Sequence, residues 1–386
     1  MSDPFLDLSG AVESEGVAHH YGAPLAEQRA LDEGDAVVSL SHHGEVTVSG
    51  ADRLSWLHSM TSQHLLGLTP GESVETLLLS PQGRIEQVIR LVDDGERSWL
   101  LVDAGRAESL TAYLQRMRFA LRVVVENVSD EVATLALRSD GRAAEVLRDS
   151  GLVALEWRDP WATVSAGGVQ YAEHADAAAS WAMAHLVVRR DDLERVAQLA
   201  RDGSVRAAGL SALDALEIRA HRPSFHGEVD ERAIPHEFDW LRSAVHLNKG
   251  CYRGQETVAK VHNLGHPPRR LALLHLEGSG GELPVAGAFV TIAGEGADAK
   301  PVGRVTRVAL HHEWGGIALA LMKRSVPEDA ALAVALGAPH NTSDDDRDTS
   351  NVQHGRIAAA QEVIVPSGAG ATRRPPKTAR LGAPPR

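Results

Sequence analysis

The stretch "KGCYRGQE", residues 249–256, contains the single cysteine of a chain of 386 residues. A lone free cysteine is most often a small buried hydrophobic side chain without chemistry of its own. The residues around Cys251 argue against that interpretation. Gly250 and Gly254 permit a close backbone approach or a left-handed conformation, which an ordinary packed segment does not need. Lys249 adds a positive charge that favours a thiolate, so the stretch predicts a site with a reactive or ligand-contacting thiol.

The residues that follow the cysteine extend this prediction. Gln255 and Glu256 supply an amide and a carboxylate, which suit the donor and acceptor edge of a heterocycle. The segment 254–263, "GQETVAKVHN", is expected to begin a helix, whose unpaired N–H groups also favour an anion nearby.

Composition excludes several classes of protein. A formal net charge of -13 argues against a broad phosphate-binding surface, so we expect no direct contact with nucleic acid. One cysteine makes neither an intramolecular disulfide nor the four-thiolate set that usually holds an iron–sulfur cluster. The first ten residues do not resemble a secretory signal, and no run of about 18 apolar residues predicts a membrane helix. We therefore predict a cytosolic protein that does not bind membranes.

Outward from the motif, the chain predicts an α+β fold. The run 36–50, "AVVSLSHHGEVTVSG", is typical of a hairpin, and a helix follows over 50–68 with Asp52 as a possible cap. Further strands are expected at 72–80, 84–94, 97–104 and 122–128, with a helix over 106–122. Antiparallel strands with inserted helices indicate a sheet packed on one face.

The character of the chain changes after the double proline at 267–268. Short strands separated by glycine and proline favour a small β-barrel or sandwich. We expect a first region over 25–265, a C-terminal β-barrel over 266–366 with a polar loop near 338–355, and a disordered tail over 367–386.

Other motifs carry less information. Neither a phosphate-binding loop nor a dinucleotide fingerprint is present. His262 and His266 have the spacing of helical metal ligands, but Gly265 and Pro267 argue against a regular helix there, so we expect no metal site.

Two further segments each allow two interpretations. The turn "SPQGRIEQ", residues 80–87, is either a plain hairpin or a turn that presents Arg84 to an anion. The segment 216–240 is either a solvated loop or a functional connection that leads into the cysteine motif.

The motif at 249–256 resembles the Lys-Gly-Cys-aromatic-x-Gly-Gln-Glu motif of the YgfZ family, which is related to the glycine-cleavage T-protein, a tetrahydrofolate-dependent aminomethyltransferase. The segments 48–68, 77–87 and 265–276 follow in the family's order. The resemblance implies two interwoven α+β subdomains closed into a ring by a C-terminal β-barrel. It also implies that tetrahydrofolate or another reduced folate sits in the central opening, lined by the cysteine motif.

The resemblance assigns roles to individual residues. Cys251 would be the functional thiol, assisted by Lys249. The residues expected to contact folate are Arg84, Gly250, Tyr252, Gly254, Gln255 and Glu256.

Three positions depart from the relatives' pattern. Glu217 stands where relatives usually have arginine, and Arg219 stands where the T-protein has a pterin-binding glutamate. Glu86 replaces an aspartate, so T-protein chemistry is not assigned to it.

The implied function is a folate-binding factor that supports assembly or repair of iron–sulfur clusters, with client or assembly proteins as partners. One alternative is a tetrahydrofolate-dependent aminomethyl transferase. Another is a non-catalytic scaffold that has lost folate binding.

Overall fold

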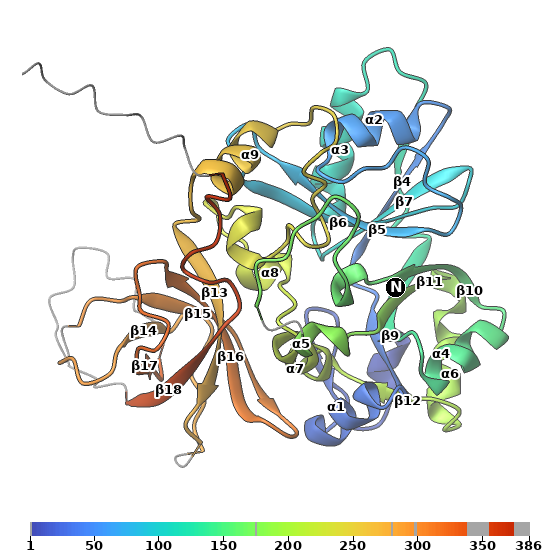
Figure 1. The fold of residues 1–386 in the computed structure, drawn as a ribbon. Helices are drawn as coiled ribbons and strands as arrows, with labels where there is room; N and C mark the ends of the chain where they lie inside the picture. Colours follow the sequence, from blue (N-terminus) through green and yellow to red (C-terminus); the bar gives the residue numbers. More distant parts are fainter. Residues whose placement is uncertain (1, 174–175, 279–280, 297–298, 338–354, 374–386) are drawn as a thin grey trace, which may run out of the picture.

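The computed structural model describes residues 2–173, 176–278, 281–296, 299–337 and 355–373. These residues form two five-stranded sheets and a closed six-stranded barrel, which surround a central region filled by α7 and by the loops that follow it (Figure 1). The predicted α+β fold with a C-terminal β-barrel is therefore confirmed. No helix in the described part of the chain is long and apolar enough to cross a membrane.

The first sheet has the strand order β5-β6-β7-β4-β8, and its pairs are antiparallel. Its strands are β4 (Gly44–Ser49), β5 (Ser73–Leu79), β6 (Ile85–Asp93), β7 (Arg97–Val102) and β8 (Val124–Asn127). The helices α2 (Arg53–Met60) and α3 (Ala107–Met117) contribute Leu57 and Leu110 to the core that this sheet buries. Helix α2 ends at Met60, eight residues before the predicted end. The side chain of Asp52 pairs with Arg122 and makes no capping hydrogen bond to α2.

The second sheet has the order β10-β11-β9-β3-β12. Its strands are β3 (Ala36–Leu40), β9 (Val132–Arg138), β10 (Val153–Arg158), β11 (Met183–Arg189) and β12 (Arg206–Ala208). The helices α4 (Arg142–Asp149) and α6 (Leu193–Arg201) cover it with apolar faces that include Leu147 and Val196.

The hairpin predicted over 36–50 is wrong. Strand β3 pairs with β9 and β12 in the second sheet, whereas β4 pairs with β7 and β8 in the first. The turn between them, with His42 and His43, carries the chain from one sheet to the other. Both strands are buried on both faces, and each is an inner strand of its own sheet with a neighbour on either side. The two strands therefore do not pair with each other as a hairpin.

The barrel has the order β13-β16-β15-β14-β17-β18. Its strands are β13 (Arg269–Leu276), β14 (Phe289–Ile292), β15 (Gly303–His311), β16 (Gly315–Lys323), β17 (Leu332–Ala335) and β18 (Arg356–Val363). Most of the polar loop predicted near 338–355 lies outside the described residues.

The remaining elements connect the sheets to the barrel. Helix α1 (Pro24–Asp32) packs on α7 (Leu210–Arg219), and α7 packs on β15 and β16. The short helices α5 (Asp176–Ala179) and α8 (Phe225–Glu228) lie in loops, and α9 (Gln255–Leu264) precedes the barrel. The hairpin of β1 (Val12–Ser14) and β2 (Val17–His20) adds elements that the sequence did not predict.

The first part of the predicted disordered tail is ordered. The backbone N–H groups of Thr372 and Arg373 donate to the carbonyls of His262 and Asn263 at the end of α9. Ala369 is buried in the core that joins the barrel to both sheets. Disorder is therefore the wrong description of residues 367–373, because apolar contacts hold them, and residues 374–386 lie outside the described part of the chain.

Candidate functional site

A cavity of about 360 Å³ lies where the two sheets, α7 and the barrel meet. The first sheet contributes Arg90 of β6 and Asp103, and the second contributes His185 of β11. Helix α7 contributes Asp214 and Glu217. The cavity thus draws on parts of the chain that are far apart in sequence, and its size is that of a small-molecule site.

Arg307 of β15 is the main positive charge on the barrel side of this cavity. Its guanidinium pairs with Glu217, with Glu228 at 3.2 Å and with Asp214 at 3.3 Å. Burial raises the pKa of Glu217 to about 7, and it also raises the pKa of Asp214, although Arg307 opposes both shifts. The cavity therefore has one carboxyl group, Glu217, that changes charge near neutral pH, and one arginine that Glu217 shares with Asp214 and Glu228.

The exchanged charges of α7 have separate roles. Glu217 faces the cavity, whereas Arg219 forms a bidentate ion pair with Asp32 of α1 at 2.6 and 2.7 Å. Arg219 is not among the residues that line the cavity. The carboxylate of α7 that lines the cavity, Glu217, therefore stands two residues before position 219, where the T-protein pattern has its glutamate.

Three of the five histidines that line the cavity, His42, His43 and His185, have lowered pKa values. Burial lowers the pKa of His42, of His43 to about 3, and of His185 well below its usual range. All three are therefore neutral at pH 7, and each offers one donor and one acceptor. The Nδ1 atoms of His42 and His185 are buried without a hydrogen-bond partner. A ligand with a polar edge would satisfy them.

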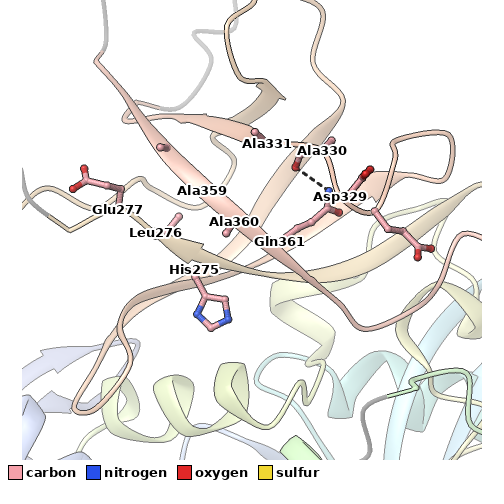
Figure 2. A pocket seen from close by; sticks show the side chains of 11 residues that line it. His275, Leu276, Glu277, Asp329, Ala330, Ala331, Ala359, Ala360 and Gln361 are labelled. Atoms are coloured by element: carbon pink, nitrogen blue, oxygen red, sulfur yellow. Dashed lines mark hydrogen bonds between the residues drawn. The ribbon is translucent and has the colours of Figure 1, made fainter.

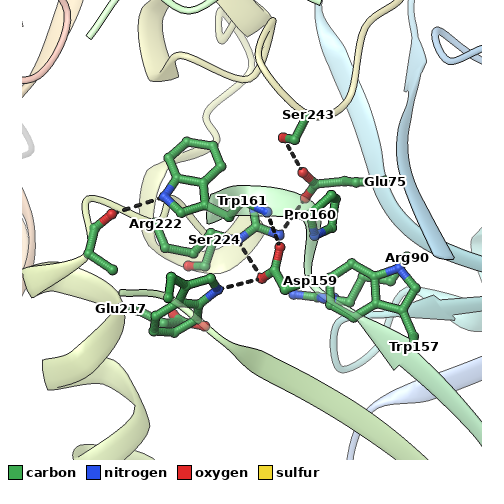
Figure 3. A network of polar contacts seen from close by, with 12 residues as sticks. Glu75, Arg90, Trp157, Asp159, Pro160, Trp161, Glu217, Arg222, Ser224 and Ser243 are labelled. Atoms are coloured by element: carbon green, nitrogen blue, oxygen red, sulfur yellow. Dashed lines mark hydrogen bonds and ion pairs between the residues drawn. The ribbon is translucent and has the colours of Figure 1, made fainter. Parts of the chain in front are cut away.

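A buried ionic network lies beside the cavity-lining residues Arg90, Glu217 and Ser224 (Figure 3). Arg222 donates to Asp159 at 2.9 Å and to Glu75 at 2.6 Å, and Ser243 donates to the other oxygen of Glu75 at 2.6 Å. Arg307 donates to the backbone carbonyl of Arg222 at 2.5 Å. The network therefore fixes the segment after α7 to the first sheet and to the barrel at once.

The cysteine motif lies elsewhere, beside the first sheet. None of the residues 249–256, and not Arg84, is among those that line the central cavity. Cys251 is exposed, so the interpretation as a buried inert residue does not hold. The helix predicted to follow it is α9, which begins at Gln255.

Lys249 has a structural role in this motif. Its Nζ donates to the carbonyl of His58, to that of Thr61 at 2.6 Å and to that of Gln63 at 2.9 Å. These carbonyls belong to the last turn of α2 and the loop after it, where helices leave acceptors unpaired. Burial lowers the pKa of Lys249, whereas the three acceptors favour the ammonium, because a neutral amine has only two hydrogens to donate.

Two of the predicted folate contacts pack on Lys249. Tyr252 is buried, and its ring lies under the ammonium with 5.0 Å between Nζ and the ring centroid. Gln255 donates to the backbone carbonyl of Lys249 at 3.2 Å. Glu256 is exposed in the first turn of α9.

The turn at 80–87 and the cysteine motif, both singled out in the sequence, contact each other. Gly254 has φ of 84°, and a Cβ there would lie 2.6 Å from the carbonyl oxygen of Ser80 and 3.0 Å from Cα of Gly83. Gly83, with φ of 73°, approaches Thr257 of α9 in the same way. The glycines therefore allow the β5–β6 turn to dock on the start of α9. Arg84 donates to the carbonyl of Glu231 at 2.9 Å.

A different cavity, of about 540 Å³, lies on the outside of the barrel along β13 and β18 (Figure 2). Its floor is mainly alanine, and its acidic residues are Glu277, Glu328 and Asp329. In the described part of the chain, no arginine or lysine lines this outer cavity, whereas Arg90 and Arg307 stand among the carboxyls of the central cavity, so the central cavity is the better candidate for a carboxylate-bearing ligand such as folate. No group of three or more potential metal ligands suited to an ion occurs among the described residues.

The comparison with family models decides the family. The model described as GCVT N-terminal domain matches residues 17–249, which is more than half of the chain. The chain belongs to the GCVT N-terminal domain family. The matched region contains both five-stranded sheets and ends at Lys249, the first residue of the cysteine motif.

Individual relatives agree with this GCVT assignment. An aminomethyltransferase of Moorella thermoacetica is 26% identical over 322 residues, which cover 78% of this chain and 82% of the relative. An aminomethyltransferase of Geobacillus kaustophilus is 29% identical over 300 residues, which cover 72% and 76%. The glycine cleavage system aminomethyltransferase T of Bartonella henselae has the same fold, with a TM-score of 0.70 at 18% identity over 95% of this chain and 96% of that one. The predicted T-protein superfamily is confirmed, and the narrower YgfZ membership stays a prediction.

The sequence missed most residues of the central cavity. Arg307 comes from an unremarkable barrel strand, and Asp214 from the middle of a helix. The adjacent pair His42 and His43 was visible as a polar interruption between two apolar runs. That interruption is the signal in the sequence that could have revealed the cavity, but the same pattern is also typical of a hairpin turn.

Proposed function

We propose that this protein binds a reduced folate in the central cavity and supports the assembly or repair of iron–sulfur clusters in client enzymes. The observation that carries the first part is the cavity itself, a site of ligand size in a member of the GCVT family. The second part rests on the resemblance of the motif at 249–256 and on the exposure of Cys251.

The residues of the cavity fit a pterin. A pterin ring presents amino and N–H donors beside a carbonyl acceptor. The cavity can pair these groups with the carboxyls of Asp214 and Glu217 and with the unpartnered Nδ1 atoms of His42 and His185. Tetrahydrofolate, when bound, supplies a carrier for one-carbon groups. The residues of this chain orient it and exclude water. The expected contacts Arg84, Gly250, Tyr252, Gly254, Gln255 and Glu256 stay a prediction, because none of them lines this cavity.

Cys251 is proposed to act at the surface. Lys249, Gly254 and Gln255 hold the loop through backbone contacts, so the loop presents the thiol in a fixed place. An exposed thiol in a fixed loop suits contact with a partner protein or with a sulfur or iron species that the partner carries. Cytosolic location is part of the proposal, since the client enzymes must be in the same compartment.

Two measurements test the proposal. Isothermal calorimetry with tetrahydrofolate should give binding to wild type and to Cys251→Ala, and weaker binding to Glu217→Ala. In a deletion strain, wild type should restore the activity of iron–sulfur enzymes under oxidative stress, and Cys251→Ala should not. Normal cluster enzymes in the deletion strain would refute the cluster role while leaving the folate result intact.

The names of the relatives favour a second candidate, a tetrahydrofolate-dependent aminomethyl transferase. Conversion of tetrahydrofolate to its methylene derivative by purified protein with an aminomethyl donor would establish it. Absence of heat with reduced folates, in a folded protein, would instead leave a scaffold.

A further inference from the structure

The loop that follows α3 exposes a large aromatic side chain. Phe119 is 80% exposed, and its backbone is left-handed, with φ of 47°. This conformation is unfavourable for a bulky side chain, and exposure of the ring to water adds to the cost. Leu121, two residues later, is 42% exposed. The fold therefore holds two apolar side chains outward at this loop without gaining core contacts from them.

The same segment is basic in an acidic protein. Residues 113–122 contain three arginines and neither aspartate nor glutamate, whereas the whole chain has a formal net charge of -13. Arg116 and Arg118 are exposed beside Phe119. We call the exposed residues Arg116, Arg118, Phe119 and Leu121 the α3 surface. Arginine and aromatic residues are enriched at the centres of protein interfaces.

The α3 surface continues to the thiol. Tyr113 lies between Arg116 and Arg253, whose guanidinium carbons are 5.6 and 5.5 Å from its ring centroid. Arg253 donates to the hydroxyl of Tyr113 at 3.0 Å and to Glu86 at 2.8 Å. Since Arg253 is two residues from exposed Cys251, the basic and aromatic residues lead from the tip of the loop to the thiol. Figure 1 shows α3 and α9 at the same end of the molecule.

We propose that the α3 surface is the docking surface for an acidic partner protein, whose apolar recess receives Phe119 and whose bound position covers Cys251. Charge complementarity argues for the acidic partner, because arginines in an otherwise acidic molecule direct an acidic patch to this end. An anionic membrane or a nucleic acid fits less well, because each brings an extended negative surface against a molecule whose net charge is -13, whereas an acidic patch on a protein can meet the α3 surface alone. The inference does not depend on the iron–sulfur role, because it rests on the exposure and charge of the α3 surface alone.

The probe is a fluorescent peptide in which aspartates and glutamates surround two leucines. We expect saturable binding that weakens as ionic strength rises. The double variant Arg116→Glu/Arg118→Glu should weaken binding about tenfold or more, and Phe119→Ala about tenfold. The matched control is Arg189→Glu/Arg195→Glu, which changes the net charge equally at exposed arginines of the second sheet and α6, and should bind as wild type does.

The single cysteine provides an independent readout. Iodoacetamide reacts only with Cys251 among cysteines, and bound peptide should slow that reaction in wild type but not in the double variant. The proposal is overturned if the peptide does not bind, if both double variants bind alike, or if bound peptide leaves alkylation unchanged. Binding of phosphatidylserine vesicles that depends on Phe119, without peptide binding, would overturn it in favour of a membrane.

Discussion

Replacement of Lys249 by methionine separates a structural role from a catalytic one. The methionine keeps most of the apolar stem but removes the three hydrogen bonds to the carbonyls of His58, Thr61 and Gln63. A hydrogen bond from a charged group contributes about 1.5–3 kcal/mol, and an acceptor left buried without a partner costs about 1–3 kcal/mol. Because water can re-enter beside His58, which is only partly buried, we expect Lys249→Met to lower the free energy of unfolding by about 3–5 kcal/mol.

The assay is urea unfolding followed by tryptophan fluorescence, with Cys251→Ala as the matched variant two residues away. Because Cys251 is exposed, its truncation should change the free energy of unfolding by less than about 0.5 kcal/mol. Any loss of function in Lys249→Met should then follow its loss of folded protein. If Lys249→Met is as stable as wild type, the reasoning fails. If it is stable and has lost folate binding, Lys249 contacts the ligand.

Three further predictions concern other residues. Gly254→Ala should destabilise the protein by about 2–4 kcal/mol in the same assay, because its Cβ would meet a carbonyl oxygen at 2.6 Å in a left-handed backbone. Gly265→Ala should not, because its φ is -121° and its Cβ would come no closer than 3.5 Å to any neighbour, which is ordinary contact. Glu45 is buried with its pKa raised to about 8, so stability falls as pH rises from about 4.5 through 8, and Glu45→Gln should remove up to about 5 kcal/mol of that fall in pH-dependent unfolding. Folate affinity measured by calorimetry should rise as pH passes through about 7, where Glu217 ionises, and Glu217→Gln should flatten the profile.

Local signals in the sequence predicted local structure well. The turn at 81–83 joins β5 to β6, and α9 begins directly after Gly254, because glycine position and apolar periodicity act within a few residues. The partners of β3 and β4 could not be predicted in the same way. The sequence of two buried strands separated by a short turn is the same whether the strands pair with each other or join different sheets. Lys249 illustrates the limit at the site. Its charge beside a thiol suggested chemistry, and only the fold shows that its ammonium is used by the end of α2.

The arrangement of β6 determines how the two candidate sites can be distinguished. Glu86, at its start, pairs with Arg253 of the cysteine motif, and Arg90 of the same strand lines the central cavity. Four residues along a strand cover about 13 Å, and these two side chains point to the same face. A ligand held around Arg90 therefore lies on the same face of the first sheet as the cysteine motif, and it is separated from Glu86 and its partner Arg253 by about 13 Å along the strand. If Cys251→Ala impairs cluster enzymes and leaves folate affinity unchanged, the thiol acts on a partner at the surface. If both are lost together, the thiol belongs to the folate site, and the separation inferred from β6 is wrong.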